Sequence, residues 1–366
     1  MRVGVPKEIK NHEYRVGLTP GSVAELVGAG HEVIVETKAG LGIDFDDQAY
    51  VDAGARIAPD AAATFRDSDM IVKVKEPQTQ EIALLEPRHL LFTYLHLAPD
   101  RPQTEGLMRS AATCIAYETV TAADGSLPLL KPMSEVAGRM SIQVGAHYLE
   151  KEQGGRGVLL GGVPGVAPAR VAILGGGVAG VNAAQMAVGM RADVTIYDIS
   201  NARLAELDMF FGSQIKTAYS SRAAIARAVS KCELVIGAVL VPGAAAPKLV
   251  TRDMLKTMKR GSVLVDIAID QGGCFETSRA TTHDNPVYEV DGVIHYCVAN
   301  MPGAVARTSA FALNNATLPF VLKLAGLGAD EAMRRDPHLA AGLNVSGGKI
   351  RHRAVAEALD LEYSPV

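Results

Sequence analysis

The chain has 366 residues, of which 48% are hydrophobic and 21% charged, and its formal net charge is −4. This length predicts about two domains, and the composition is ordinary for a soluble globular enzyme. The charge excludes a broad basic surface for nucleic acid or for an anionic membrane. The N-terminus has no apolar signal-peptide core, and no window of about 18 residues is uninterruptedly apolar, so neither secretion nor a membrane span is expected.

The cysteines are far apart in the sequence and form no C-x-x-C pair. We expect them to pack as small hydrophobic residues in a reducing cytoplasm, and to form neither disulfides nor a zinc site. They are Cys114, Cys232, Cys274 and Cys297.

The N-terminal third alternates expected strands with expected helices. One helix should begin at Pro20 and end at Gly28, because Thr19 is a good N-cap and proline fits the first turn. This alternation predicts a parallel sheet with helical crossovers. The expected strands are residues 2–5, 32–36, 70–74, 90–95 and 114–117.

A long helical pattern, residues 134–152 with Ser134 as its cap, precedes a second α/β unit. We expect this helix to bridge two domains. A loop rich in glycine and proline follows it at residues 154–168. The expected strands of the second unit are residues 170–174, 193–197, 234–239, 262–267 and 293–299.

The last part of the chain is expected to be helical. It contains a helical stretch at residues 307–325, interrupted at Pro319, and then a helical tail. Because these end pieces show no strand pattern of their own, we expect them to pack on the N-terminal domain.

The most informative motif follows the first strand of the second unit. Residues 175–180 form a G-x-G-x-x-G turn between an apolar strand and a helix-like run. In a dinucleotide site Gly175 permits the tight turn, Gly177 lets the backbone approach a pyrophosphate, and Gly180 allows close helix–strand packing. The N–H groups at the start of the helix are available to the phosphates.

Asp198 ends the next strand, about 20 residues further on, where a carboxylate bonds the ribose 2′-OH. The alternative is a glycine-rich turn in an ordinary α/β protein, but turn, spacing and acid agree. The sequence therefore predicts two Rossmann-like, doubly wound parallel-sheet domains, separated by a cleft and bridged by the long helix. The expected substrate (catalytic) domain is residues 1–129 with 307–366, and the expected NAD-binding domain is residues 130–306.

Polar residues follow four expected strands, at the edge where open α/β sheets bind ligands. Lys75 and His96 end strands of the first domain, and Asp270 and Asn300 follow strands of the second. Closing the cleft would bring these four together at a nicotinamide. Each also fits a structural role alone, Lys75 as a solvated strand end, His96 as a structural histidine and Asp270 as a turn residue. Their joint placement favours chemistry.

Arg15 is a fifth candidate, just before the expected helix start at Thr19. A guanidinium and a helix N-terminus both favour an anion, and arginine can bind a carboxylate with two parallel hydrogen bonds. An ordinary surface arginine is the alternative.

Several motifs resemble the alanine dehydrogenase and pyridine nucleotide transhydrogenase family, across essentially the whole chain. Residues 2–8, 15–20 and 73–77 resemble the family as a whole. The segments that resemble its alanine dehydrogenase branch are residues 93–98, 131–135, 162–166, 266–273 and 298–303.

The resemblance implies NAD-dependent oxidative deamination of L-alanine to pyruvate and ammonia, reversible as reductive amination. It implies that Arg15 and Lys75 hold the substrate carboxylate and the carbonyl or imine side. His96 would be the general acid/base and Asp270 a second catalytic group. A histidine suits this role because its reference pKa is near 6.5.

The resemblance also implies a set of cofactor-binding residues, in addition to the three motif glycines. Asp198 favours NAD by bonding the ribose and repelling a 2′-phosphate, whereas Arg203 is able to accept that phosphate; we expect NAD. The set is Ser134, Val178, Ala179, Asp198, Arg203, Ser220, Val239, Leu240, Ile267, Asp270, Arg279, Val298, Asn300 and Met301.

Members of the family are typically homohexamers, and some carry a metal-binding pair in the helix after the linker. Here the corresponding residues are Lys323 and Leu327, which cannot form that site, so no bound metal is expected. Small-molecule substrates and a cytoplasmic location are expected, without nucleic-acid or membrane partners.

Three alternatives stay open. A transhydrogenase-like NAD(H)-binding component would exchange hydride with a membrane partner and have no amino-acid substrate. It resembles this chain at Arg15 and Lys75 but not around His96, and no membrane-docking continuation follows Val366. A lysine-forming saccharopine dehydrogenase shares the two-domain plan. A non-catalytic NAD sensor leaves the strand-end residues unexplained.

Overall fold

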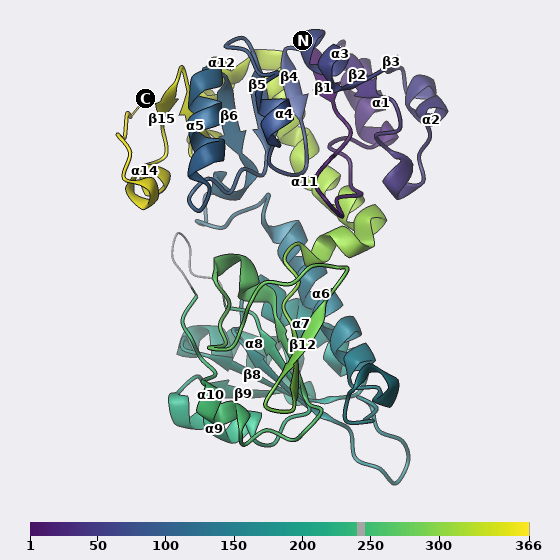
Figure 1. Cartoon of the computed structure of the whole chain (residues 1–366), viewed down its shortest axis with the longest axis vertical. Coiled ribbons are helices and arrows are strands. Elements are labelled where there is room, and N and C mark those ends of the chain that lie inside the picture. Colours follow the sequence, from purple (N-terminus) through teal and green to yellow (C-terminus); the bar gives the residue numbers. More distant parts are fainter. Residues whose placement is uncertain (240–245, 366) are drawn as a thin grey trace. The chain divides into compact units, whose positions relative to one another are not determined.

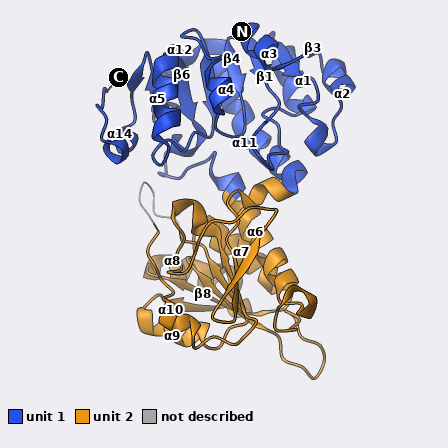
Figure 2. Ribbon diagram, viewed as in Figure 1, with its two compact units in different colours: residues 1–133, 305–366 blue, residues 134–304 orange. Residues whose placement is uncertain are grey.

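The computed structural model describes residues 1–239 and 246–365. The chain divides into two compact units, shown in Figure 2. Unit 1 comprises residues 1–133 and 305–366, and unit 2 comprises residues 134–304. Their assignment as substrate and NAD-binding domains stays a prediction.

Unit 1 is built on an eight-stranded sheet with the order β15-β14-β6-β5-β4-β1-β2-β3 (Figure 1). Strands β1 to β6 are parallel, and their order reverses between β1 and β4. This is the doubly wound arrangement, in which ligands bind at the carboxyl ends of the strands near the reversal. The strands are β1 (Arg2–Val5), β2 (Glu32–Glu36), β3 (Arg56–Ala58), β4 (Met70–Val72), β5 (Leu90–Thr93), β6 (Thr113–Ala116), β14 (Leu343–Ser346) and β15 (Lys349–Ile350).

The helices of unit 1 include the predicted one after Thr19. Helix α1 spans Pro20–Gly28, and the Thr19 hydroxyl accepts the Ser22 N–H as its N-cap, which confirms that prediction. The others are α2 (Asp47–Asp52), α3 (Ala61–Arg66), α4 (Thr79–Ile82), α5 (Arg101–Ser110), α11 (Ala306–Leu327), α12 (Ala329–Arg335), α13 (Pro337–Ala340) and α14 (Arg353–Leu359), with 3-10 turns η1 (Leu41–Ile43) and η2 (Tyr117–Thr119).

Helix α11 joins the C-terminal part of the chain to unit 1. Asn314 is buried, and its side-chain oxygen accepts hydrogen bonds from the Thr19 N–H and the Ser22 hydroxyl, both at 2.8 Å. The segment Met301–Leu327 is long and apolar enough to span a membrane by length and composition alone. Nine of the 22 residues of α11 are buried, Leu313 and Leu324 among them, and the polar contact with the α1 cap ties the helix to unit 1.

Two expectations for the C-terminal part are wrong. Helix α11 continues through Pro319; Asn315 and Pro319 are both exposed, so the carbonyl that proline leaves unbonded faces water. The tail also has strands, because β14 pairs antiparallel with β6 and β15 with β14. Gly347 and Gly348 have φ of 57° and 77°, the positive values that a two-residue hairpin turn requires.

Unit 2 is built on a seven-stranded sheet with the order β12-β13-β11-β10-β7-β8-β9. All strands except β12 are parallel, and the order reverses between β7 and β10. The strands are β7 (Arg170–Leu174), β8 (Asp193–Asp198), β9 (Lys216–Tyr219), β10 (Leu234–Gly237), β11 (Val263–Asp266), β12 (Val287–Val290) and β13 (Val293–Tyr296). The predicted fold, two doubly wound sheets with interleaved helices, is thereby confirmed, with antiparallel strands added at one edge of each sheet.

The helices of unit 2 begin with α6 (Lys131–Tyr148), which starts in the last residues of unit 1. The expected range 134–152 is shifted: Pro132 fits the first turn, so Ser134 lies inside the helix, and Lys151–Gln153 is a separate 3-10 turn, η3. The others are α7 (Val178–Gly189), α8 (Asn201–Phe211), α9 (Arg222–Val229) and α10 (Arg252–Leu255), with 3-10 turns η4 (Gly212–Gln214), η5 (Ile267–Gln271) and η6 (Met301–Val305). All four cysteines are buried, as predicted for small hydrophobic residues, and their thiols are free.

Candidate active site

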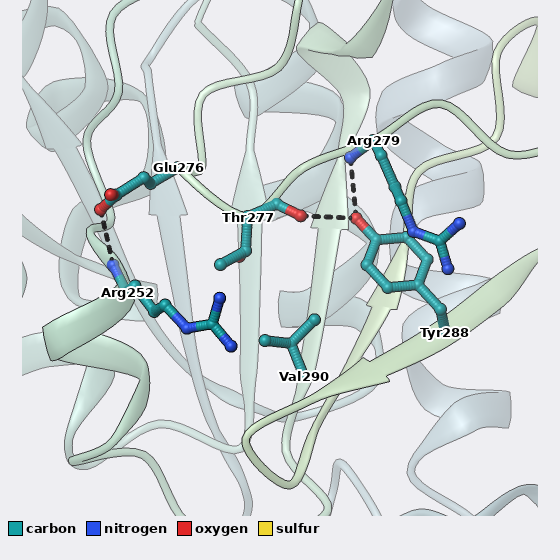
Figure 3. Close-up of a pocket in the computed structure, with 6 residues that line it drawn as sticks. All are labelled: Arg252, Glu276, Thr277, Arg279, Tyr288 and Val290. Carbon is teal, nitrogen blue, oxygen red and sulfur yellow. Dashed lines mark hydrogen bonds between the residues drawn. The ribbon is translucent and has the colours of Figure 1, made fainter.

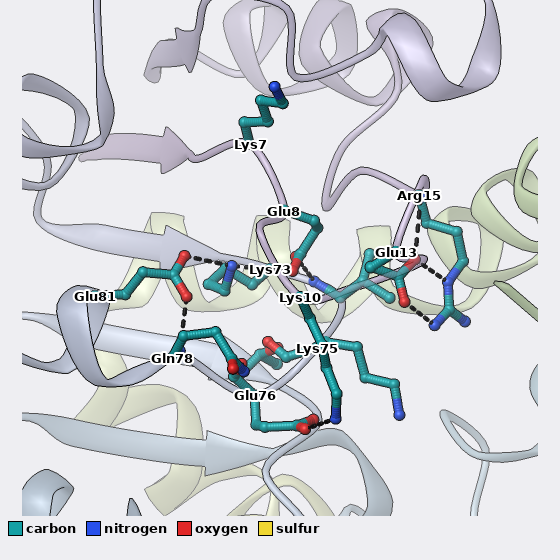
Figure 4. A network of polar contacts seen from close by, with 12 residues as sticks. Lys7, Glu8, Lys10, Glu13, Arg15, Lys73, Lys75, Glu76, Gln78 and Glu81 are labelled. Carbon is teal, nitrogen blue, oxygen red and sulfur yellow. Dashed lines mark hydrogen bonds and ion pairs between the residues drawn. The ribbon is translucent and has the colours of Figure 1, made fainter. Parts of the chain in front are cut away.

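The candidate substrate residues of unit 1 all follow strands that end at one edge of its sheet. Arg15 lies in the loop after β1, Lys75 follows β4 and His96 follows β5. Because these strands are parallel and adjacent, their carboxyl ends meet at the same edge. In the view of Figure 4, the Arg15 and Lys75 side chains extend to the same side of a network of polar contacts.

Arg15 is not the surface arginine of the alternative interpretation, because only 2% of its side chain is exposed. Its Nε and Nη2 donate to the two carboxylate oxygens of Glu13 at 2.7 and 2.5 Å, and Nη1 lies 3.0 Å from the sulfur of Met133. Glu13 therefore holds one edge of the guanidinium. A guanidinium binds a carboxylate with two parallel hydrogen bonds, as Nε and Nη2 of Arg15 do here with Glu13.

Lys73, two residues before Lys75, serves a different purpose. It is fully buried, and its ammonium donates to Glu8 at 3.0 Å and to Glu81 at 2.7 Å. Burial acts to lower the pKa of Lys73, but the attraction of the two carboxylates outweighs it and the pKa is raised. Lys73 is thus a permanent cation that fixes the loop after β1 against β4, since Glu8 also accepts the Val74 N–H.

Lys75 is partly exposed and has no such partner. Among residues 1–239 and 246–365, no hydrogen bond or ion pair of its ammonium is found, while its carbonyl accepts the Thr93 hydroxyl at 2.9 Å. The backbone of Lys75 is therefore tied to β5, while its ammonium is placed at the same sheet edge as Arg15.

His96 has φ of 50°, a left-handed conformation that is uncommon for a residue other than glycine. The Glu118 carboxylate accepts its N–H at 2.6 Å and lies 3.9 Å from its Nδ1. The imidazole stacks on the Tyr94 ring, with centroids 5.7 Å apart and an interplanar angle of 5°. Backbone strain held in place by neighbours is a recurrent property of functional sites.

Tyr94 connects His96 to Arg15. Its ring is buried, its hydroxyl donates to the Leu129 carbonyl at 2.5 Å, and burial raises its pKa while the nearby Arg15 charge acts to lower it. A cavity of about 740 Å³ opens beside this edge, between α4 and α5, and Lys10, Glu76 and Asp100 contribute polar groups to it.

The candidate cofactor residues of unit 2 also gather at the carboxyl edge of their sheet. The glycine turn follows β7, Asp198 ends β8 and Ser220 follows β9; on the other side of the reversal, Val239 follows β10, and Ile267 and Asp270 follow β11. Val298, Asn300 and Met301 come after β13, while Ser134 lies in α6. Leu240 lies outside the described residues.

The glycine turn has the geometry that a pyrophosphate requires. Gly175 has φ of 106°, and a Cβ on Gly180 would lie 1.9 Å from the Gly175 carbonyl, so only glycine fits at either position. A Cβ on Gly177 would meet no atom within 4 Å, so the space at the start of α7 is open. The first hydrogen bond of α7 is from the Val181 N–H to the Gly177 carbonyl, which leaves the preceding N–H groups at the N-terminus directed outward.

Asp270 is exposed on η5, and a buried aspartate positions that turn. Asp266 caps η5 through the Ala268 N–H at 3.1 Å, and it also accepts the Cys274 N–H at 2.9 Å and the Ser278 hydroxyl. Burial raises the pKa of Asp266, which these donors oppose. Asn300, like His96, is held at positive φ, here 65°.

Arg279 lies at a different place, beside the edge strand β12 (Figure 3). Its guanidinium stacks 4.1 Å from the Tyr288 ring centre, and its N–H donates to the Tyr288 hydroxyl at 2.8 Å. Together with Arg252 it lines a small cavity of about 250 Å³. Arg279 is thus placed by Tyr288 and not by the strand ends that carry Asp198 and the glycines.

Comparison with known proteins identifies the family. The family model of the Alanine dehydrogenase/PNT N-terminal domain matches residues 4–137, and the family model of the C-terminal domain matches residues 141–353. The chain belongs to the alanine dehydrogenase/PNT family. The similarity extends over its whole length: the chain is 62% identical over 363 residues to the alanine dehydrogenase of Halomonas elongata, covering 99% of this chain and 98% of that protein.

Solved structures of alanine dehydrogenase/PNT proteins agree. An L-alanine dehydrogenase structure superposes with a TM-score of 0.95 at 56% identity, covering 98% of this chain and 99% of that one. A transhydrogenase from Sinorhizobium meliloti superposes with a TM-score of 0.83 at 28% identity, covering 97% and 100%. Of these two structures, the chain is therefore much more similar to the L-alanine dehydrogenase.

Three buried or half-buried acids of this alanine dehydrogenase/PNT chain were not predicted from the sequence. Glu13 pairs with Arg15, Glu118 holds the turn at His96, and Asp266 holds the turn at Asp270. A signal existed only for Asp266, which lies in the motif that includes Asp270. Within the part of the chain that the structure describes, no group of three or more His, Cys, Asp or Glu residues forms a possible metal site.

Proposed function

We propose that the chain catalyses the reversible, NAD-dependent oxidative deamination of L-alanine to pyruvate and ammonia. Two observations support this proposal. The chain is 62% identical to an alanine dehydrogenase, and its candidate substrate and cofactor residues lie at the carboxyl edges of two different sheets. One edge has an open glycine turn followed by Asp198, and the other has a buried arginine, a lysine and a strained histidine.

Oxidation removes a hydride from Cα of alanine and a proton from its nitrogen, which leaves an imine. Water then adds to the imine carbon, and ammonia leaves to give pyruvate. Bound NAD supplies the acceptor for the hydride. The addition of water and the loss of ammonia need proton transfers and an oriented substrate, which side chains of this protein can supply.

Arg15 would bind the substrate carboxylate, with its guanidinium oriented by the ion pair to Glu13. Lys75 would bind the carbonyl or imine side. His96 would accept a proton from the amine, return it to the nitrogen that leaves as ammonia, and accept one from the attacking water; the reverse reaction runs these transfers backwards. Asp270 would be a second catalytic group, near the reacting carbon and the ribose.

The cofactor would be held by the residues at the edge of unit 2, with its pyrophosphate at the start of α7 and its ribose at Asp198. We also propose that the protein prefers NAD to NADP, forms a homohexamer and acts in the cytoplasm in amino-acid catabolism. Its partners would be small-molecule substrates only, and it would bind no metal. Four buried free thiols support the cytoplasmic location.

The alternative is a transhydrogenase-like NAD(H)-binding component without an amino-acid substrate. The more distant match to the transhydrogenase, 28% identical against 56% for the L-alanine dehydrogenase structure, disfavours it. Measuring NADH formation at alkaline pH with each L-amino acid decides between them. Alanine should give the highest rate, with glycine and 2-aminobutyrate slower, since one methylene discriminates by about 1–3 kcal/mol. No rate with alanine above the others would overturn the proposal, and activity with lysine plus 2-oxoglutarate would favour a saccharopine dehydrogenase.

A further inference from the structure

Both backbone polar groups of Gly176 are hydrogen-bonded to charged side chains. Oδ2 of Asp198 accepts the Gly176 N–H at 2.8 Å, and Nε of Arg203 donates to the Gly176 carbonyl at 2.7 Å. A Cβ on Gly176 would lie 3.2 Å from that Asp198 oxygen and 3.5 Å from Cγ of Arg203. Asp198 and Arg203 are therefore both hydrogen-bonded to the glycine turn.

The outer end of Arg203 is tied to a third residue. Its Nη1 donates to Oε2 of Glu206 at 2.6 Å, one turn further along α8. The Arg203 side chain is 35% exposed and the Glu206 side chain 65% exposed, so the pair lies at the surface. Nε and Nη1 of Arg203 are thus both engaged, one by the turn and one by Glu206.

The two cofactors differ at the ribose 2′ position. NAD has a hydroxyl there, which bonds a carboxylate such as Asp198, whereas NADP has a phosphate, which an arginine accommodates. An arginine paired with a carboxylate attracts a phosphate less strongly, and that carboxylate also repels the phosphate at short range.

We infer that Glu206 is a specificity-determining residue that favours NAD over NADP by holding Arg203. This inference rests on the proposed function, because it takes unit 2 as the cofactor-binding unit. It also explains how an arginine five residues after Asp198 is compatible with NAD preference.

The direct test is Glu206→Gln in the full chain, which keeps the side-chain length and removes the charge. The dissociation constants of NADH and NADPH are measured separately by fluorescence titration. NADPH should bind about two- to fivefold more tightly than to the unmodified chain, because exposed ion pairs contribute little. NADH affinity should change less than about twofold, since Arg203 is the one polar partner found for Glu206 among residues 1–239 and 246–365.

A matched control and a double variant make the test specific. Asp208→Asn removes another exposed charge from the same helix and should leave NADPH affinity unchanged. Arg203→Leu combined with Glu206→Gln should lose the gain, because Glu206 acts through Arg203. Unchanged NADPH affinity in Glu206→Gln, an equal gain in Asp208→Asn, or a gain that survives in the double variant would each overturn the inference.

The outcomes also separate the inference from the proposed function. A chain that oxidises alanine but shows no effect of Glu206→Gln overturns the inference alone. A chain that binds NADH, responds as predicted to Glu206→Gln and oxidises no alanine overturns the alanine assignment and supports the inference. A chain that binds neither NADH nor NADPH overturns both.

Discussion

The Glu118 carboxylate accepts the backbone N–H of His96 at 2.6 Å. The same carboxylate accepts the Leu95 N–H, at 3.2 Å from each oxygen. These bonds hold His96 in its left-handed conformation, which costs on the order of 1–2 kcal/mol for such a residue. Glu118 is therefore a positioning residue for the proposed acid/base.

Replacing Glu118 should lower kcat more than it changes KM. Glu118→Ala removes both acceptors and frees the turn, and a displacement of a proton-transfer group by about 1 Å can cost about 100-fold in rate. Glu118→Gln keeps an acceptor oxygen and should lose less. Steady-state kinetics with alanine measure both, and equal kinetics for Glu118→Ala and the unmodified chain would contradict the positioning role.

His96→Ala should abolish most turnover and retain NADH binding. General acid/base groups contribute about 100- to 10,000-fold, and alanine is subject to the same left-handed penalty, so the turn is not relaxed by the change. His147→Ala, at a half-exposed position in α6, is the matched control and should be fully active. If His96→Ala keeps normal turnover, His96 is a structural residue.

Arg15 requires a charge-balanced variant. Arg15→Ala deprives the fully buried Glu13 of its guanidinium, and breaking a buried ion pair costs about 3–5 kcal/mol of stability. Arg15→Met with Glu13→Gln removes both charges and should unfold at a higher temperature than Arg15→Ala. The double variant should still show a KM for alanine raised about 10-fold or more, because a charged hydrogen-bonded contact is lost. An unchanged KM would remove Arg15 from the substrate site.

Lys73→Met should destabilise the fold at neutral pH by about 3–5 kcal/mol, because it deprives two buried carboxylates of their cation. Burial already raises the pKa of Glu8, and loss of Lys73 raises it further. An acid whose folded-state pKa exceeds its unfolded value contributes most stability below the unfolded value and loses it as pH rises. Denaturant unfolding should therefore show a smaller deficit at pH 5 than at pH 8.

Lys216→Met is the control for that experiment, because the Lys216–Asp193 pair is exposed and should contribute less than about 1 kcal/mol. A Lys73→Met deficit that is no larger than that of Lys216→Met would show that the buried cluster adds nothing to stability.

The sequence was sufficient for the elements whose pattern is local. Apolar runs predicted the buried parallel strands, Thr19-Pro20 predicted the α1 cap, and the glycine spacing at 175–180 predicted a turn whose geometry accepts only glycine at two positions. The β14–β15 hairpin was missed although Gly347-Gly348 is a recognisable turn signal, because its strands are short.

The acids that position the site could not be predicted in the same way. Glu118 and His96 are 22 residues apart, and only the register of β5 and β6 brings their strand ends together. Glu13 lies two residues before Arg15, and two such charges are usually both exposed to solvent. Only the structure shows that both are buried and form an ion pair. The sequence pattern thus predicts the ends of the strands, whereas the contacts between charged side chains at those ends depend on the three-dimensional fold.

The proposed reaction passes a hydride from Cα of alanine directly to NAD. The most direct measurement supplies L-alanine deuterated at Cα together with NAD and determines the mass of the NADH formed. We predict NADH that carries one deuterium, together with a slower rate than with ordinary alanine if the transfer limits turnover. NADH without deuterium, or no NADH at all, would contradict the account.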